Sequence, residues 1–159
     1  MITEKEKDFL KRAIELSHQG MKKEEGGPFG CVVVKDDKIV GEGSNMVTSS
    51  NDPTAHSEIV AIRAACKELN TYQLTDCEIY CSCEPCPMCL GAIYWARPRK
   101  VIFANTREDA AEIDFDDDFI YQEIILHMSD RKIPFLHHPH PFAKKVFEEW
   151  KNLENKKEY

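Results

Sequence analysis

The stretch that decides the fold is CEIYCSCEPCPMCLGAIYWAR, residues 77–97. Its first part, residues 77–82, is short and largely apolar, which predicts a buried strand. Pro87 suits the first position of a helix, where a missing N–H costs no hydrogen bond, and Pro98 would stop that helix. The stretch therefore predicts a strand followed directly by a helix, which is typical of an α/β protein.

Similar patterns predict further elements on both sides of this stretch. Thr3 and Glu6 form a capping pair before apolar residues at helical spacing, and two β-branched runs flank a polar turn at residues 35–38. The predicted helices cover residues 3–20, 54–69, 87–97, 119–127 and 142–153, and the predicted strands cover 29–34, 39–44, 77–82, 101–104 and 133–136. A β-rich start followed by alternating helices and strands predicts an α/β sandwich with a mixed sheet.

Size and composition indicate one globular domain over residues 1–159. Hydrophobic residues make up 42% and charged residues 31%, and no apolar run approaches the roughly 18 residues of a membrane helix. The charged N-terminus lacks the apolar core of a signal peptide, so a cytoplasmic protein without a membrane partner is expected. A net charge of −7 repels phosphate backbones, which disfavours a nucleic-acid partner.

Cysteines are crowded in one segment: five of the seven lie between Cys77 and Cys89. In a cytoplasmic chain this indicates a metal or thiolate chemistry rather than a disulfide framework. Cys86 and Cys89 share one face at a helix start, whose positive end favours thiolates. Two thiolates and the neutral imidazole of His56 would balance the charge of Zn²⁺ and leave a fourth position for water, as in catalytic zinc sites.

A carboxylate near such a site could move a proton between the water and a leaving group. Glu58, two residues after His56, is the candidate for this task. Positions 56 and 58 are about 200° apart on an ideal helix, so their spacing alone does not bring both side chains to one metal.

Several of these residues also have a simpler interpretation. Cys86 and Cys89 could form a closed structural zinc site with Cys83 as an extra ligand. Asp117 lies in an acidic run near a helix start, where it could be only a solvated cap. The histidines within residues 137–140 are interrupted by proline, which favours an exposed loop over a metal site.

The pattern H-x-E in residues 56–58 followed by P-C-x-x-C in residues 85–89 is the signature of zinc deaminases. On these residues the chain resembles the cytidine-deaminase-like superfamily of zinc-dependent nucleobase deaminases, and within it the guanine deaminase branch. The resemblance covers nearly the whole chain, through residues 27–30, 51–56, 83–97, 115–121 and 155–159. Ser57 departs from the family pattern, which usually has alanine at that position.

The resemblance implies a three-layer α/β/α sandwich with a mixed five-stranded sheet. It implies one Zn²⁺ per chain on His56, Cys86 and Cys89, with Glu58 as the proton shuttle and Asp117 as a second acidic group at the base. The residues implied to contact the base are Asn45, Phe29, Trp95 and Tyr159.

The resemblance further implies the reaction and the assembly. Hydroxide generated at the zinc would attack C2 of guanine, yielding xanthine and ammonia, in a homodimer whose residues 140–159 are swapped so that Tyr159 closes the partner's pocket. Alternatives are a deaminase of tRNA adenosine, guanosine, cytosine or a triazine, and a non-catalytic interaction domain stabilised by zinc. Phe29 and Trp95 could also be core residues.

Overall fold

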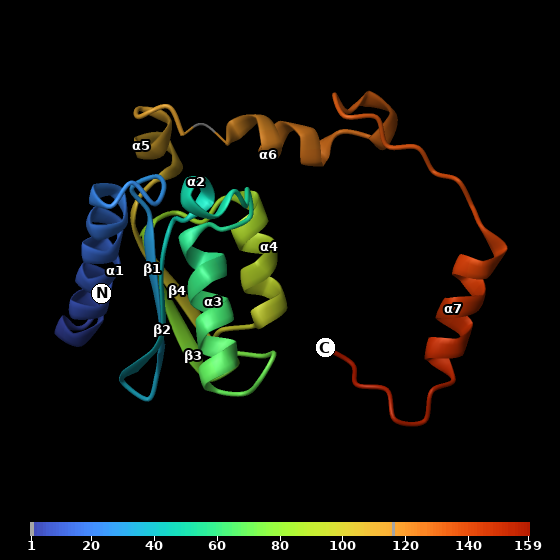
Figure 1. Ribbon diagram of the computed structural model, residues 1–159, viewed down its shortest axis with the longest axis horizontal. Coiled ribbons are helices and arrows are strands. Elements are labelled where there is room, and N and C mark those ends of the chain that lie inside the picture. The colour runs from blue at the N-terminus through green and yellow to red at the C-terminus, as the bar shows by residue number, and fades with distance from the viewer. Residues whose placement is uncertain (1, 116) are drawn as a thin grey trace. The chain divides into compact units, whose positions relative to one another are not determined.

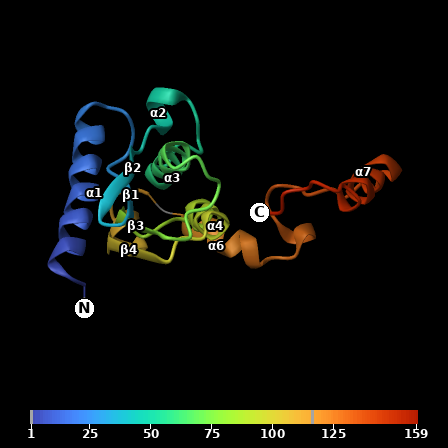
Figure 2. The ribbon, with the colours of Figure 1, turned by 90° about the horizontal axis from the view of Figure 1, so that it is seen from below.

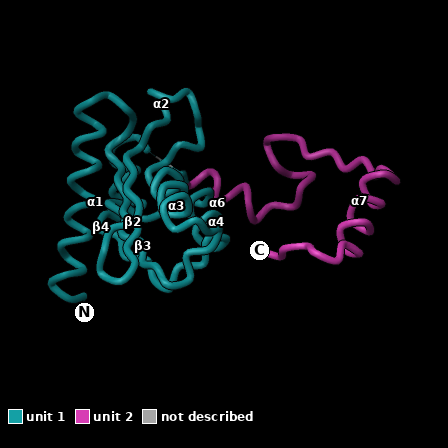
Figure 3. Tube along the Cα trace, turned by 60° about the horizontal axis from the view of Figure 1, so that its bottom comes forward, with its two compact units in different colours: residues 1–117 teal, residues 118–159 magenta. Residues whose placement is uncertain are grey.

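The computed structural model describes residues 2–115 and 117–159. The chain divides by its internal contacts into two compact units, residues 1–117 and residues 118–159, which Figure 3 draws in two colours. None of the helices within the described ranges is long and apolar enough to cross a bilayer.

The first unit is built on a mixed four-stranded sheet with the order β2-β1-β3-β4. β1 (Gly30–Lys35) and β2 (Lys38–Ser44) form an antiparallel hairpin, and β3 (Cys77–Cys83) lies antiparallel to β1. β4 (Lys100–Asn105) pairs with β3 in parallel (Figure 1). This arrangement confirms the mixed sheet predicted from the sequence and four of its strands.

Strand β1 is buried on both faces, and its alternate residues belong to two separate cores. Cys31 and Val33 pack into the core on one face, whereas Val32 and Val34 pack into the core on the other. A strand covered on both sides has a continuous apolar sequence rather than an alternating one, which explains the uninterrupted run at its centre.

Helices cover both faces of the sheet, so the unit has three layers. α1 (Glu4–Lys22) packs against β1 and β3 on one face, and α3 (Ser57–Glu68) and α4 (Pro87–Ala96) lie on the other, as Figure 2 shows from below. Gly43 allows α3 to approach β2 closely, because a Cβ at this position would lie 2.4 Å from the carbonyl oxygen of Ser57. The start of α3 is therefore pressed directly onto the sheet.

Two short α-helices of the first unit, α2 and α5, were not among the predicted elements. α2 (Val47–Ser50) is a single turn inside the predicted polar loop. α5 (Arg107–Ala111) begins with a capping box in which Thr106 and Asp109 satisfy each other's backbone N–H groups. The Thr-x-x-Asp pattern was therefore a usable signal for α5.

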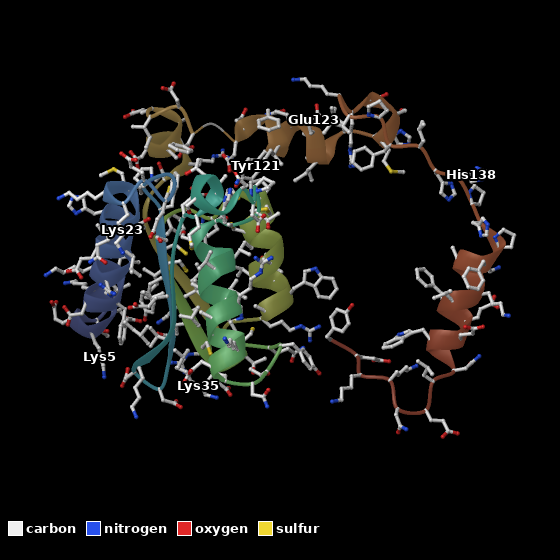
Figure 4. The ribbon with its side chains drawn as sticks, in the orientation of Figure 1. Lys5, Lys23, Lys35, Tyr121, Glu123 and His138 are labelled. Atoms are coloured by element: carbon white, nitrogen blue, oxygen red, sulfur yellow. The ribbon has the colours of Figure 1, made fainter. Side chains whose placement is uncertain are left out.

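The second unit contains α6 (Asp118–Ile125), the 3-10 helix η1 (Met128–Asp130) and α7 (Pro141–Lys151). Figure 4 shows Tyr121 and Glu123 on α6 and His138 on the extended segment before α7. His140 caps α7 by accepting a hydrogen bond from the Phe142 N–H through Nδ1 at 3.2 Å.

The predicted fifth strand at residues 133–136 is wrong. The sheet has four strands, and residues 133–136 form no regular element within the described part of the chain. Pro134 lacks the N–H that a ladder needs, and Leu136 is 92% exposed. A short apolar run becomes a strand only where a neighbouring strand can pair with it.

Candidate metal centre

His56 lies at the start of α3, where the backbone is not yet helical. It is the N-cap residue, with φ −67° and ψ 154°, whereas Glu58 is already the second residue of the helix. The 200° separation of an ideal helix therefore does not apply, because the extended residue 56 redirects its side chain. This backbone change is what brings the imidazole and the carboxylate to one cavity.

Cys86 and Cys89 lie at the start of α4, and Cys86 has the same N-cap position that His56 has in α3. Cys86 is the N-cap residue, with φ −63° and ψ 168°, and Pro87 occupies the first turn as the sequence predicts. α4 packs beside α3, and the Sγ atom of Cys86 lies 3.5 Å from Nδ1 of His56. Two helix starts thus meet at the predicted ligands.

The three predicted ligands form one donor cluster. A nitrogen of His56 and the sulfur atoms of Cys86 and Cys89 all lie within 4.8 Å of one another. Zinc, with bonds of about 2.0–2.3 Å to such atoms, can bridge donors at this spacing. A nitrogen and two sulfur donors suit zinc, and three protein ligands leave a fourth position open.

Mutual hydrogen bonds set the protonation of the cluster. The Cys89 thiol and the His56 ring stabilise the Cys86 thiolate and lower the pKa of Cys86 to about 4. The same contacts with Cys86 raise the pKa of His56 and the pKa of Cys89. One thiolate is thus already favoured by the protein itself, and metal binding would displace the proton of Cys89.

Cys83 does not join this cluster, although a closed four-ligand site was one interpretation of the sequence. Its Sγ atom donates to the carbonyl oxygen of Thr106 at 3.4 Å. Burial raises the pKa of the Cys83 thiol to about 11, so it stays protonated. The cluster formed by the described residues is therefore open rather than closed.

Glu58 is buried beside the cluster and also lines the cavity. Only 6% of its surface is exposed, and burial raises the pKa of its carboxyl group. The Ser57 hydroxyl donates a hydrogen bond to Oε2 of Glu58 at 2.9 Å. A carboxyl group with a raised pKa next to a metal site is suited to proton transfer.

A cavity of about 380 Å³ opens beside the cluster, within the first unit. This volume falls in the range of small-molecule sites, on the order of 300–1,000 Å³. The aromatic side chains of Phe29 and Phe115 form part of its wall, edge to face with ring centroids 4.9 Å apart. Gly27 makes room for this pair, since a Cβ there would lie 2.7 Å from Cζ of Phe115.

Two predicted polar contact residues line the same cavity. Asn45 is 5% exposed, and its Oδ1 accepts the Val47 N–H at 3.1 Å, which orients its amide group. Asp117 is half-buried at the cavity and is close enough to His56 to contribute to the raised pKa of the imidazole. Asp116, from the same acidic run, lies outside the described residues.

Two other predicted contact residues, Trp95 and Tyr159, are not among the described residues that line this cavity. Trp95 lies on α4 with 62% of its surface exposed and is absent from the described residues that line the cavity. Tyr159 belongs to the second unit and is 68% exposed. Their contacts with a base stay predictions.

The sequence interpretation assigned no role to several lining residues. These are Gly27, Val47, Thr48, Glu84, Arg107, Ala110, Asp114 and Phe115. Most belong to loops or short helices after strand ends, such as α2 and α5, which carry no apolar periodicity. Glu84 has a visible structural role there, since its Oε2 accepts the Arg107 N–H at 3.2 Å.

The chain is similar in sequence to two kinds of curated deaminase. It is 57% identical over 151 residues to the guanine deaminase of Bacillus subtilis, covering 95% of this chain and 97% of that protein. It is 43% identical over 96 residues to a tRNA-specific adenosine deaminase of Aquifex aeolicus, covering 60% of this chain and 63% of that protein.

A solved structure and a family description agree with the geometry. The X-ray structure of guanine deaminase from Bacillus subtilis superposes with a TM-score of 0.94 at 54% identity, covering 99% of both chains. Residues 3–105, which include both helix starts, match the cytidine and deoxycytidylate deaminase zinc-binding region. With this match over the cluster of His56, Cys86 and Cys89 and over most of its length, the chain belongs to the family of zinc-binding cytidine and deoxycytidylate deaminases.

Proposed function

We propose that this protein is a zinc-dependent guanine deaminase, which converts guanine and water to xanthine and ammonia. The observation that carries the proposal is the cavity in which His56, Cys86 and Glu58 meet under an aromatic wall. Its size suits a free base, and the Bacillus subtilis relative that matches 95% of this chain is a guanine deaminase.

His56, Cys86 and Cys89 would hold the zinc ion, because their donor atoms form the cluster described above. When bound, zinc supplies a water molecule acidic enough to lose its proton near neutral pH. The ligands come from the starts of two helices that pack against each other, so the packing of α3 and α4 positions both sets of donor atoms.

Glu58 would carry protons between the water and the base. Its carboxylate accepts the proton of the attacking water and delivers it to ring N3 of guanine, next to the attacked carbon C2. The exocyclic amine on C2 needs a second proton before it can leave as ammonia, since an unprotonated amide-like nitrogen leaves poorly. Asp117, which lines the same cavity, or Glu58 itself would provide that proton and would recover it from the hydroxyl group added to C2, as the C–N bond breaks and the C2 carbonyl of xanthine forms.

Other residues would orient the base. The Asn45 Oδ1 is engaged by the Val47 N–H, so the Asn45 Nδ2 group is the donor offered to an acceptor atom of the purine. Phe29 would pack on the base with its ring, supported by Phe115. Trp95 is proposed as a further wall residue on the resemblance alone.

A homodimer would explain the exposed apolar surface of both units. α4 exposes Leu90, Tyr94 and Trp95, and α7 exposes Phe142 and Phe147. Exposed apolar surface of this extent marks interaction sites. We propose that residues 140–159 are exchanged between two copies and that Tyr159 closes the partner's cavity. Size-exclusion chromatography with light scattering should give twice the mass of 18.3 kDa.

The second candidate is deamination of adenosine in tRNA, which the 43% identical Aquifex aeolicus relative favours over 60% of this chain. The net charge of −7 argues against it, because a tRNA substrate demands basic surface.

A cytoplasmic location is proposed for the chain, since all seven cysteines are free, as is typical of a reducing compartment.

An ammonia-release screen tests the function. Purified, zinc-loaded protein is incubated with guanine, adenine, cytosine, a triazine, the corresponding nucleosides and tRNA. We expect rapid ammonia release from guanine with formation of xanthine, and at least about 100-fold lower kcat/KM for the others. Faster reaction with tRNA or a nucleoside would contradict the proposal, and no ammonia from any substrate would favour a non-catalytic domain.

A further inference from the structure

Ser57 is the residue between the proposed ligand His56 and the proposed proton carrier Glu58. It is the first residue of α3 and is only 1% exposed. Burying a hydroxyl is unfavourable unless it makes a hydrogen bond. Its Oγ atom meets this requirement by donating to Oε2 of Glu58 at 2.9 Å.

This hydrogen bond acts on the group that must transfer protons. A hydroxyl that donates to a carboxylate forms a charge-assisted bond, which is about twice as strong as a bond between neutral groups. It engages Oε2 of Glu58, and an ionised carboxylate keeps further lone pairs for the proton it takes from water. The bond therefore restrains the Glu58 side chain and leaves lone pairs of the carboxylate free to accept a proton.

The backbone that carries Ser57 has little freedom to move. Its carbonyl oxygen lies 2.4 Å from the place that a Cβ on Gly43 of β2 would occupy, so the first turn of α3 rests directly on the sheet. The hydroxyl is thus presented to Glu58 from a fixed position. Residues that orient a catalytic group are most effective when packing fixes their own geometry.

A second donor reaches Glu58, but it is not available when metal is bound. The Cys89 thiol also interacts with the Glu58 carboxylate. A cysteine that coordinates zinc is deprotonated and can no longer donate. The Ser57 hydroxyl keeps its proton in either state.

We propose that Ser57 is a positioning residue, whose hydroxyl holds the Glu58 carboxylate in the orientation needed for proton transfer to and from the base. The proposal rests on the proposed deaminase function of the same site. It concerns orientation only, so binding of the base and of zinc should be independent of Ser57.

The variant Ser57→Ala tests this role, because it removes the hydroxyl and leaves a smaller side chain at a helix start. We expect kcat for guanine to fall about ten-fold, as for other supporting hydrogen bonds around metal sites, with KM within about two-fold of wild type. Zinc content and melting temperature should stay close to wild type. Unchanged kcat, or a loss confined to KM, would overturn the proposal.

Coupling to Glu58 separates positioning from a structural role. In Glu58→Asp the side chain is one methylene shorter, so the carboxylate no longer reaches the Ser57 hydroxyl. Adding Ser57→Ala to this variant should therefore lower kcat by less than about two-fold. The matched control is Ser82→Ala, another buried serine, whose Oγ accepts the Gly30 N–H at 2.9 Å. It should lower the melting temperature and leave kcat nearly unchanged. Equal losses from Ser57→Ala in both Glu58 backgrounds would assign Ser57 a structural role only.

The two proposals fail in different ways. If wild-type protein deaminates another base from the screen but not guanine, the proposed substrate is wrong and the Ser57 series is run on that base with the same expected ratios. If wild type deaminates a base and Ser57→Ala matches it, only the positioning role is overturned. No ammonia from wild type with any base overturns both.

Discussion

The two compact units differ in the extent to which their apolar side chains are buried. In the first unit, side chains such as Val32 and Val33 are fully buried on opposite faces of the sheet. In the second unit, none of residues 118–159 is buried, and Phe147 on α7 is 78% exposed although this helix has an apolar face. Both units contain apolar residues at helical spacing, so amino-acid composition alone does not explain the difference in burial.

The difference shows what each unit needs in order to be stable. The first unit covers its sheet with its own helices, and a helix acquires most of its stability from such packing. The second unit has α6 and α7 but no sheet or helix of its own that covers them. We therefore expect the first unit to hold the zinc ligands and Glu58 in place by itself and the second to depend on another surface.

The largest expected effect concerns the cluster in the first unit. Cys89→Ser should lower zinc content well below one per chain and reduce kcat/KM by at least about 10³-fold, since a lost ligand removes both metal and acidic water. Metal analysis by mass spectrometry together with the ammonia assay checks this outcome. Full zinc retention would show that the ligand set His56, Cys86 and Cys89 is wrong.

The next effect separates proton transfer from metal binding. Glu58→Gln keeps the shape of the side chain but cannot exchange a proton, so kcat should fall by about 10²–10⁴-fold. Zinc content should remain at one per chain because Glu58 is not in the donor cluster. A zinc-loaded variant with activity near wild type would exclude Glu58 as the shuttle.

A smaller effect is expected at Asp117, the last residue of the first unit. Asp117→Asn should lower kcat for guanine by about 10–100-fold if Asp117 supplies a proton to the amine. Asp118→Asn, on the first residue of α6, is the control for a solvated acidic cap and should lose less than about two-fold. Similar losses in both variants would support the solvated-cap interpretation of Asp117.

The tail of the second unit gives the sharpest test of the comparison. Deleting residues 155–159 should leave zinc content and the melting temperature unchanged, and lower kcat/KM by about ten-fold through loss of a lid that excludes water. An exposed terminus with no function would be dispensable. Retention of full kcat/KM after the deletion would mean that the first unit needs nothing from the tail.

Mixing two variants then tests whether the tail acts on a second copy. A Glu58→Gln chain with an intact tail is combined with a chain that lacks residues 155–159 but keeps Glu58. If tails are exchanged between subunits, the mixture should regain activity that neither variant has alone. No recovery in heterodimers demonstrated by native mass spectrometry would contradict a lid supplied by the partner.

The smallest effect concerns stability of the first unit. The Glu6 carboxylate accepts from Lys100 and from the Thr3 N–H, and these contacts lower its pKa from 4.5 to about 2. Its contribution to stability is therefore present above pH 4.5 and is lost as the pH falls towards 2. Glu6→Gln should lower the melting temperature by a few degrees at pH 7 and by much less near pH 2.5.

Thermal melts at both pH values check this prediction. Glu4→Gln is the control, because Glu4 precedes Glu6 in the same helix turn and pairs with the exposed side chain of Lys7. A constant difference between wild type and Glu6→Gln across this pH range would argue that the ion pair with Lys100 adds nothing.

Local sequence signals predicted much of the first unit. The apolar run of β1, the capping pair at Thr3 and the proline at the start of α4 are each read from neighbouring residues, and each is confirmed. Donor types and spacing likewise pointed to His56, Cys86 and Cys89, since few residues other than histidine and cysteine bind zinc. Short polar elements such as α2 escaped prediction because they carry no periodic apolar pattern.

Only the tertiary structure decided which distant residues meet. Residues 56 and 86 are 30 positions apart, and they come within 3.5 Å because α3 and α4 start side by side with an extended cap residue at each start. Residues 133–136 have a strand-like composition but join no sheet among the described residues, and Phe115 lines the cavity only because Gly27 leaves room for its ring. A sequence determines local conformation and donor chemistry through neighbouring residues, whereas contacts between distant segments depend on how whole elements pack.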